Sequence, residues 1–124
     1  MLDITLDEND GIAIFEPQNK LSELDFKEAV FIIDPYINKF KKLNGLIIVT
    51  KTFPGWESFA ALVSHLSFVK DHHKKIACVA FVTDSPVGNL AEQVASHFVS
   101  AEIKAFKYNE LETAKTWVTE SNQA

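Results

Sequence analysis

The stretches LIIVTK (residues 46–51) and IACVAFVT (residues 76–83) decide the fold of this 124-residue chain. Both are continuous apolar runs rich in β-branched residues, which is typical of parallel strands covered on both faces. Each run is followed by a turn and then by a segment with helical periodicity. Strands that alternate with helices indicate an α/β domain with right-handed crossover connections.

The chain before these runs begins with a predicted hairpin. Residues 2–6 alternate apolar and polar side chains, as a strand with one buried face does. The turn sequence Asn9-Asp10-Gly11 follows, and GIAIFEP (residues 11–17) resumes as a second strand. We therefore expect the first strand to be an antiparallel edge of the sheet.

A helix is predicted next. Ser22 suits its N-cap, helical periodicity continues to Phe40, and Asn44-Gly45 suits its C-terminal end. Pro35 interrupts the pattern, so either one helix kinks there or a second helix begins with Asp34 as its cap.

The rest of the chain completes an alternating order. Residues 57–73 and 87–98 have the apolar stripes of helices, residues 102–108 alternate as a final strand, and Asn109 suits the cap of a last helix. The fold class is therefore α/β, with the order β-β-α-β-α-β-α-β-α and a mainly parallel sheet packed by four or five helices. We expect a single domain over residues 1–124.

Composition excludes several classes of protein. The net charge of −5 disfavours nucleic acid, whose phosphates require a clustered basic face. Cys78 is the single cysteine, so no disulfide framework is possible, and its apolar neighbours suggest an inert buried thiol in a reducing cytoplasm. The sequence has no signal-peptide pattern and no apolar run long enough to span a membrane, so we expect a cytoplasmic protein.

The loop FPGW (residues 53–56) places two large rings where turns usually carry small polar residues. In open parallel sheets, ligands bind beyond the carboxyl ends of the strands, and this loop follows such an end. Phe53 and Trp56 are therefore interpreted either as walls of an apolar pocket or as packing of the next helix onto its strand.

A second candidate loop, Thr83-Asp84-Ser85-Pro86, follows the next strand. These residue types favour a helix start, with Asp84 or Ser85 as cap, and the amides there are also suited to binding an anionic group. Together the two loops and their flanking helices predict a ligand site formed by Phe53, Trp56, Phe59, Val63, Phe81, Asp84, Val87 and Leu90.

Signals for metal binding or catalysis are missing from the sequence. His65 and His72 lie two helical turns apart, too far for joint ligation without other donors. No G-x-S-x-G elbow occurs, and the four glycines are too dispersed for a phosphate loop. We expect no metal, no cofactor and no catalytic residue.

Three stretches carry a resemblance to a known family. LIIVT followed by PGW, then KDHHKKIACVAFVTD, then ASHFVSAEIKAFKYNELETAKTWV resemble the STAS domain, and most closely the bacterial SpoIIAA-like group. That group is similar in layout to CRAL-TRIO lipid carriers, which implies a gap between helices and sheet where an apolar ligand enters.

One feature of the STAS family is missing from this chain. SpoIIAA and its close relatives carry a phosphorylated serine in the loop after the third strand, where this chain reads Thr50-Lys51-Thr52-Phe53-Pro54-Gly55-Trp56. The phospho-switch is therefore not expected here.

Some apolar residues are expected to lie off the core. Leu24 and Phe31 form such a pair on the first helix, and the helix after FPGW has a second stripe that includes Ala61, His65 and Phe68. These residues predict a dimer contact or a membrane-docking surface, and we favour a homodimer because symmetric dimers are the commonest oligomers.

Three functional hypotheses follow. The first is a non-catalytic module that binds a small apolar or amphipathic, lipid-like ligand, with peripheral contact to the inner membrane face. The second is a STAS-type regulator that recognises a protein partner without the phospho-serine switch. The third, an enzyme, rests only on the unassigned residues Asp84, His65 and His97.

Overall fold

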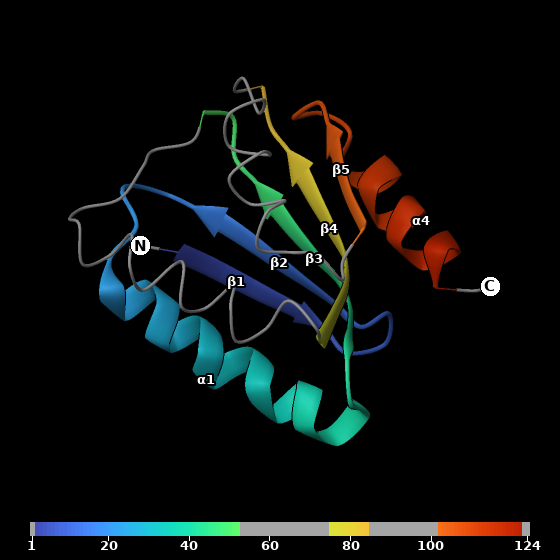
Figure 1. Cartoon of the computed structure of the whole chain (residues 1–124). Coiled ribbons are helices and arrows are strands. Elements are labelled where there is room, and N and C mark those ends of the chain that lie inside the picture. The colour runs from blue at the N-terminus through green and yellow to red at the C-terminus, as the bar shows by residue number, and fades with distance from the viewer. Residues whose placement is uncertain (1, 53–74, 85–101, 123–124) are drawn as a thin grey trace.

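The computed structural model describes residues 2–52, 75–84 and 102–122 (Figure 1). These residues form five strands and two helices: β1 (Leu2–Asp7), β2 (Ile12–Pro17), α1 (Glu23–Phe40), β3 (Leu43–Val49), β4 (Ile76–Val82), β5 (Glu102–Phe106) and α4 (Leu111–Ser121). The helices expected at residues 57–73 and 87–98 lie outside the described residues, so two of the expected four or five helices are described.

The five strands form one mixed sheet in the order β1-β2-β3-β4-β5. β1 pairs with β2 antiparallel, and the remaining neighbours are parallel, which confirms the antiparallel N-terminal edge. Gly11 closes the hairpin at a φ of 67°, a conformation that glycine adopts without strain. The Asp7 carboxylate supports the turn by accepting hydrogen bonds from the N–H groups of Asn9 and Asp10 at 3.0 and 3.2 Å.

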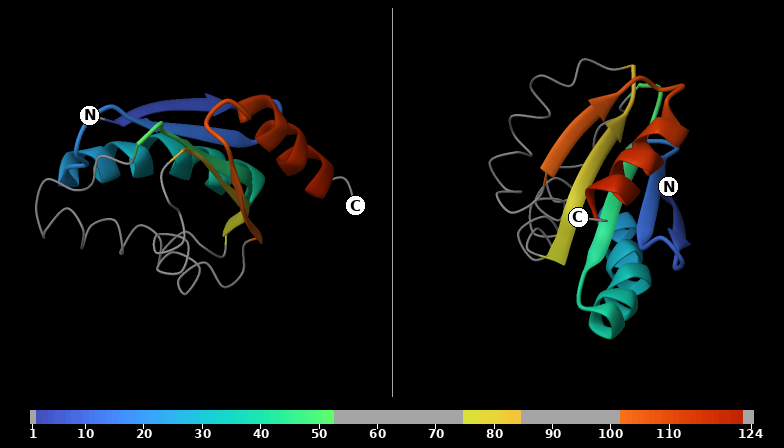
Figure 2. Two further views of the ribbon diagram at one scale, coloured as in Figure 1. Left: turned by 90° about the horizontal axis from the view of Figure 1, so that it is seen from above. Right: turned by 90° about the vertical axis from the view of Figure 1, so that its right-hand side faces the viewer.

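Helix α1 covers one face of the sheet. It packs on β1 and β3, and its inner residues join side chains from alternate strand positions in a core that includes Phe15, Phe26, Ile33 and Phe81. Figure 2 shows α1 and α4 on opposite faces of the sheet. The strand side chains that pack under α4 form a second core cluster, because successive side chains of a strand point to opposite faces.

The start of α1 is fixed by a partly buried capping box. The Ser22 hydroxyl accepts from the Asp25 N–H at 3.3 Å, and the Asp25 carboxylate accepts from the Ser22 N–H at 2.8 Å, which confirms Ser22 as the cap. The same carboxylate, 5% exposed, also accepts from the Leu2 N–H at 3.1 Å. Asp25 therefore joins the first strand to the first helix.

A single helix passes through Pro35, which decides between the two alternatives left open by the sequence. Pro35 is on the exposed side of α1 and, having no N–H, does not donate to the Phe31 carbonyl. The expected end at Asn44-Gly45 is wrong, because Lys41 caps α1 in a left-handed conformation with a φ of 74°. β3 already begins at Leu43.

Helix α4 covers β3, β4 and β5 on the other face. Ala114 and Val118 are both fully buried, and Val118 lies so close to Gly45 that a Cβ there would be 2.5 Å from its Cγ1. The expected cap Asn109 is wrong by one residue: Glu110 occupies the N-cap position and makes no side-chain cap bond. Its carboxylate instead accepts from the Lys107 N–H at 2.8 Å.

Candidate functional site

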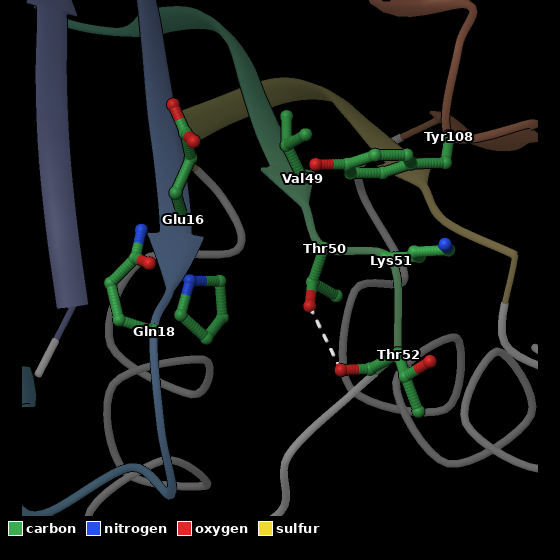
Figure 3. A pocket seen from close by; sticks show the side chains of 8 residues that line it. Glu16, Gln18, Val49, Thr50, Lys51, Thr52 and Tyr108 are labelled. Carbon is green, nitrogen blue, oxygen red and sulfur yellow. Dashed lines mark hydrogen bonds between the residues drawn. The ribbon is translucent and has the colours of Figure 1, made fainter.

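A pocket of about 270 Å³ lies where the parallel strands end (Figure 3). The end of β2, the end of β3 with the residues that follow it, and the connection from β5 to α4 each contribute to its walls. The lining residues are Glu16, Pro17, Gln18, Val49, Thr50, Lys51, Thr52 and Tyr108. This is the edge of an open parallel sheet at which ligands usually bind.

Backbone hydrogen bonds hold the loops at this edge in register. The Lys51 carbonyl accepts from the Asp84 N–H at 3.2 Å and from the Thr83 hydroxyl at 3.3 Å. The Asp84 carboxylate then accepts from the Tyr108 N–H at 3.2 Å. The segments after β3, β4 and β5 are thus linked in one chain, and Asp84 positions the backbone that carries the Tyr108 ring.

The described walls of the pocket are mainly polar. Among the described residues that line it, only Pro17 and Val49 are apolar, and Figure 3 shows the Tyr108 side chain extending towards Val49. Lys51 and Glu16 bring one positive and one negative charge. The Gln18 amide donates to Asp3 at 2.9 Å, which orients it from the neighbouring strand.

Thr50 is not available as a phosphorylation site in this conformation. It is 9% exposed, and its hydroxyl donates to the Thr52 carbonyl at 3.0 Å. The next hydroxyl, that of Thr52, is exposed and belongs to the pocket. Thr50 therefore stabilises the loop. This agrees with the sequence, in which the phosphorylated serine of SpoIIAA is missing.

Two of the ligand residues predicted from the sequence fall within the described residues. Asp84 is exposed at the carboxyl edge, next to the pocket, whereas Phe81 is 3% exposed in the core beneath α1 and does not line this pocket. The other six lie outside the described residues, and their role in ligand binding stays a prediction. They are Phe53, Trp56, Phe59, Val63, Val87 and Leu90.

Most of the pocket residues were not predicted from the sequence. Glu16, Gln18 and Tyr108 come from segments far apart in the chain, and only the sheet order brings them together. The available signal was the position of each at a strand end, because the carboxyl ends of parallel strands meet at one edge. Lys51 and Thr52 also follow a strand end, but the sequence interpretation of this loop was based on the rings of Phe53 and Trp56.

The residues predicted to form a dimer or membrane surface also divide in two. Leu24 is 62% exposed and Phe31 is 81% exposed on α1, as expected for an off-core pair. Ala61, His65 and Phe68 lie outside the described residues.

Other kinds of site find little support in the part of the chain that is described. Its His, Cys, Asp and Glu side chains form no group of three that is suited to holding a metal ion. Neither of its helices is long and apolar enough to cross a membrane. Cys78 is a free thiol that is 2% exposed, and burial, followed by the nearby Glu102 carboxylate, raises its pKa.

The architecture is that of a small mixed α/β domain with a pocket at the carboxyl edge of its sheet. The chain matches the SpoIIAA-like family over residues 12–119 and belongs to it. This confirms the resemblance drawn from the sequence.

A solved structure supports the same fold. The chain is similar to an uncharacterized protein of the DUF3478 family with a SpoIIAA-like fold from Shewanella loihica PV-4. The TM-score is 0.72 at 21% sequence identity, and the alignment covers 95% of this chain and 92% of that protein. At that identity the likeness concerns the fold alone. No curated protein matches the chain significantly.

Proposed function

We propose that this protein is a non-catalytic binding module that takes the polar end of a small amphipathic molecule into the pocket at the carboxyl edge. The observation that carries the proposal is the chemistry of that pocket. Lys51, Thr52, Gln18 and Tyr108 offer hydrogen-bond donors, and Glu16 offers a carboxylate acceptor. Such a set recognises a polar head group.

The size of the pocket favours a head group over a whole ligand. Sites that enclose a drug-sized molecule usually measure about 300–1,000 Å³, and this pocket measures about 270 Å³. The chain continues from Thr52 directly into Phe53-Pro54-Gly55-Trp56. We therefore propose that the apolar end of the ligand contacts Phe53 and Trp56. The protein would take up such a ligand through peripheral contact with a membrane.

A fluorescence titration tests this function. In a Trp117→Phe background Trp56 is the only tryptophan, and it reports binding of a dansyl-labelled fatty acid by energy transfer. Lys51→Gln and Tyr108→Phe are expected to weaken binding about tenfold or less, as the loss of one hydrogen bond does. Lys107→Gln removes a lysine close by that does not line the pocket, and is expected to leave binding unchanged.

The proposal is wrong if the titration gives no energy transfer and native mass spectrometry of the purified protein detects no bound small molecule. Vesicle co-sedimentation separates the membrane part. If the protein binds the fatty acid in solution but does not sediment with vesicles, the ligand pocket is supported and the membrane contact is wrong.

A second candidate, the STAS-type regulator, is favoured by family membership. It recognises a protein partner and requires no small molecule. Affinity capture from a native lysate distinguishes the two functions. A stoichiometric protein partner retained by Lys51→Gln supports the regulator, because that variant alters only the pocket.

A further inference from the structure

We propose that α1 is a self-association surface, through which two copies of the chain pair with their α1 helices antiparallel about a two-fold axis at Phe31. The surface consists of Leu24, Phe31 and Pro35, which we call the outer row. Their spacing of seven and four residues places them on one side of the helix. Leu24 is 62% exposed, Phe31 is 81% exposed, and Pro35 is also exposed.

The outer row differs in position from the other exposed apolar residues of α1. Ile32, which is 36% exposed, lies about 100° round the helix from Phe31. Phe40 is 50% exposed, but it follows Phe31 by two and a half turns and therefore lies on the other side of α1. Its ring is 4.6 Å from that of Tyr36. A phenylalanine in mid-helix with four-fifths of its area in water contributes little to the fold of one copy, whereas burial between copies removes that area from water.

Charge selects a second copy as the occupant of this surface. The exposed charges in the first half of α1 are Glu23, Lys27 and Glu28, and Lys39, Lys41 and Lys42 lie exposed at its end. An antiparallel pair brings Glu28, beside the outer row, towards the basic end of the partner, whereas a parallel pair places like charges together.

The position of Phe31 makes the surface self-complementary. It lies near the midpoint of the helix Glu23–Phe40, so a two-fold axis there brings the two Phe31 rings together. Glu28 and Lys39 lie on the same flank of the outer row, and helix side chains lean towards their own N-terminus. In the antiparallel pair these two side chains therefore lean towards each other from different copies.

This inference does not depend on the proposed ligand. α1 begins next to the carboxyl edge, after β2, and ends at the start of β3. Antiparallel pairing thus puts the two pockets at opposite ends of the dimer and leaves both open.

Sedimentation velocity over a range of protein concentrations tests the association. The wild-type chain is expected to shift from monomer to dimer, and Phe31→Glu is expected to remain monomeric at tenfold higher concentration. Phe40→Glu is the matched control, the same change on the same helix but off the outer row, and is expected to dimerise. Circular dichroism identifies any variant that fails to fold.

Cross-linking tests the geometry. Oxidised Phe31→Cys is expected to form a disulfide-linked dimer, because only residues near a two-fold axis meet their own copy. Leu24→Cys lies away from the axis and is expected to stay uncross-linked, and the native Cys78 is buried. A dimer in which Leu24→Cys cross-links with itself and Phe31→Cys does not would overturn the antiparallel arrangement.

A charge reversal tests the choice of partner. Glu28→Lys and Lys39→Glu each place like charges together at both symmetric contacts, so each is expected to weaken the dimer about threefold to tenfold, and the double variant to restore it. A wild-type chain that stays monomeric up to several hundred micromolar contradicts the proposal. The proposal is also contradicted if Phe31→Glu abolishes vesicle binding but leaves the oligomeric state unchanged.

Discussion

Helices α1 and α4 cover the two faces of one sheet, but they differ in length, in capping and in their outer sides. α1 has 18 residues and a partly buried capping box, whereas α4 has 11 residues and no side-chain cap. The outer side of α4 is polar, with exposed Glu112, Thr113, Thr116 and Glu120. The outer side of α1 has Phe31 in its middle.

The difference separates two ways of holding a helix on a sheet. α4 depends on close approach, because Val118 sits directly over Gly45. α1 depends on its buried carboxylate and on large inner side chains, and its outer row takes no part in either. We conclude that α4 is built for packing alone, whereas α1 has a second surface that the fold of one copy does not use.

The largest effect is expected at the start of α1, in contrast to the start of α4. Asp25→Ala removes a buried carboxylate that accepts from two backbone N–H groups, so we expect a loss of about 3 kcal/mol in the free energy of unfolding. Glu110→Ala removes the corresponding carboxylate of α4, which makes an exposed hydrogen bond, and is expected to cost about 0.5 kcal/mol. Urea denaturation of both variants measures the contrast, and equal losses would contradict it.

The next effect concerns the close contact under α4. Gly45→Ala places a Cβ 2.5 Å from the Val118 Cγ1 and 2.8 Å from its Cγ2, and we expect a loss of about 2 kcal/mol from overpacking. Adding Val118→Ala creates room for the new methyl group. The double variant is therefore expected to lose about 1 kcal/mol less than the sum of the two single losses. Additive losses in urea denaturation would show that the two residues do not compete for space.

A smaller effect on the free energy of unfolding is expected at alkaline pH, where one buried group on each face of the sheet loses its proton. Burial raises the pKa of Cys78 on the α4 face and of Tyr36 on α1, with Glu8 and Asp7 adding to the shift of Tyr36. The unfolded chain therefore releases these protons first. Stability is fully present below the unfolded pKa values and falls as pH rises through them towards the folded ones.

Unfolding measured across pH 7.5–11 separates the two groups. Cys78→Ala is expected to flatten the decline that begins above about pH 8.5, and Tyr36→Phe the decline that begins above about pH 10. If both variants keep the slope of the wild-type protein, the linkage to these two groups is wrong.

The course of the sheet was predictable because its signals are local. The alternation in residues 2–6, the Asn9-Asp10-Gly11 turn and the apolar runs in β3 and β4 each specify a strand without reference to the rest of the chain. The end of α1 was not predictable in this way. Gly45 resembles a helix C-cap in sequence, but its missing side chain makes room for Val118, a contact that appears only in the folded protein.

The candidate site was predictable in place but not in composition. A site at the carboxyl edge follows from the parallel order of strands alone. Its walls combine Glu16, Thr52 and Tyr108, which are distant in sequence, and Asp84 acts on Tyr108 through a backbone hydrogen bond. No spacing rule connects these residues, because the sheet order and the loop conformations decide which of them meet.

The smallest effect on stability is expected on the outer sides of the two helices. Phe31→Ser changes a side chain that is 81% exposed, so below the dimerisation range we expect a change within about 0.5 kcal/mol. Thr116→Ala, on the outer side of α4, removes only a local bond to the Glu112 carbonyl at 3.0 Å and is expected to be equally mild. The two variants should separate in sedimentation velocity, where only Phe31→Ser abolishes the dimer. If Phe31→Ser instead costs several kcal/mol in a monomer, its ring packs within one copy and the outer row is part of the core.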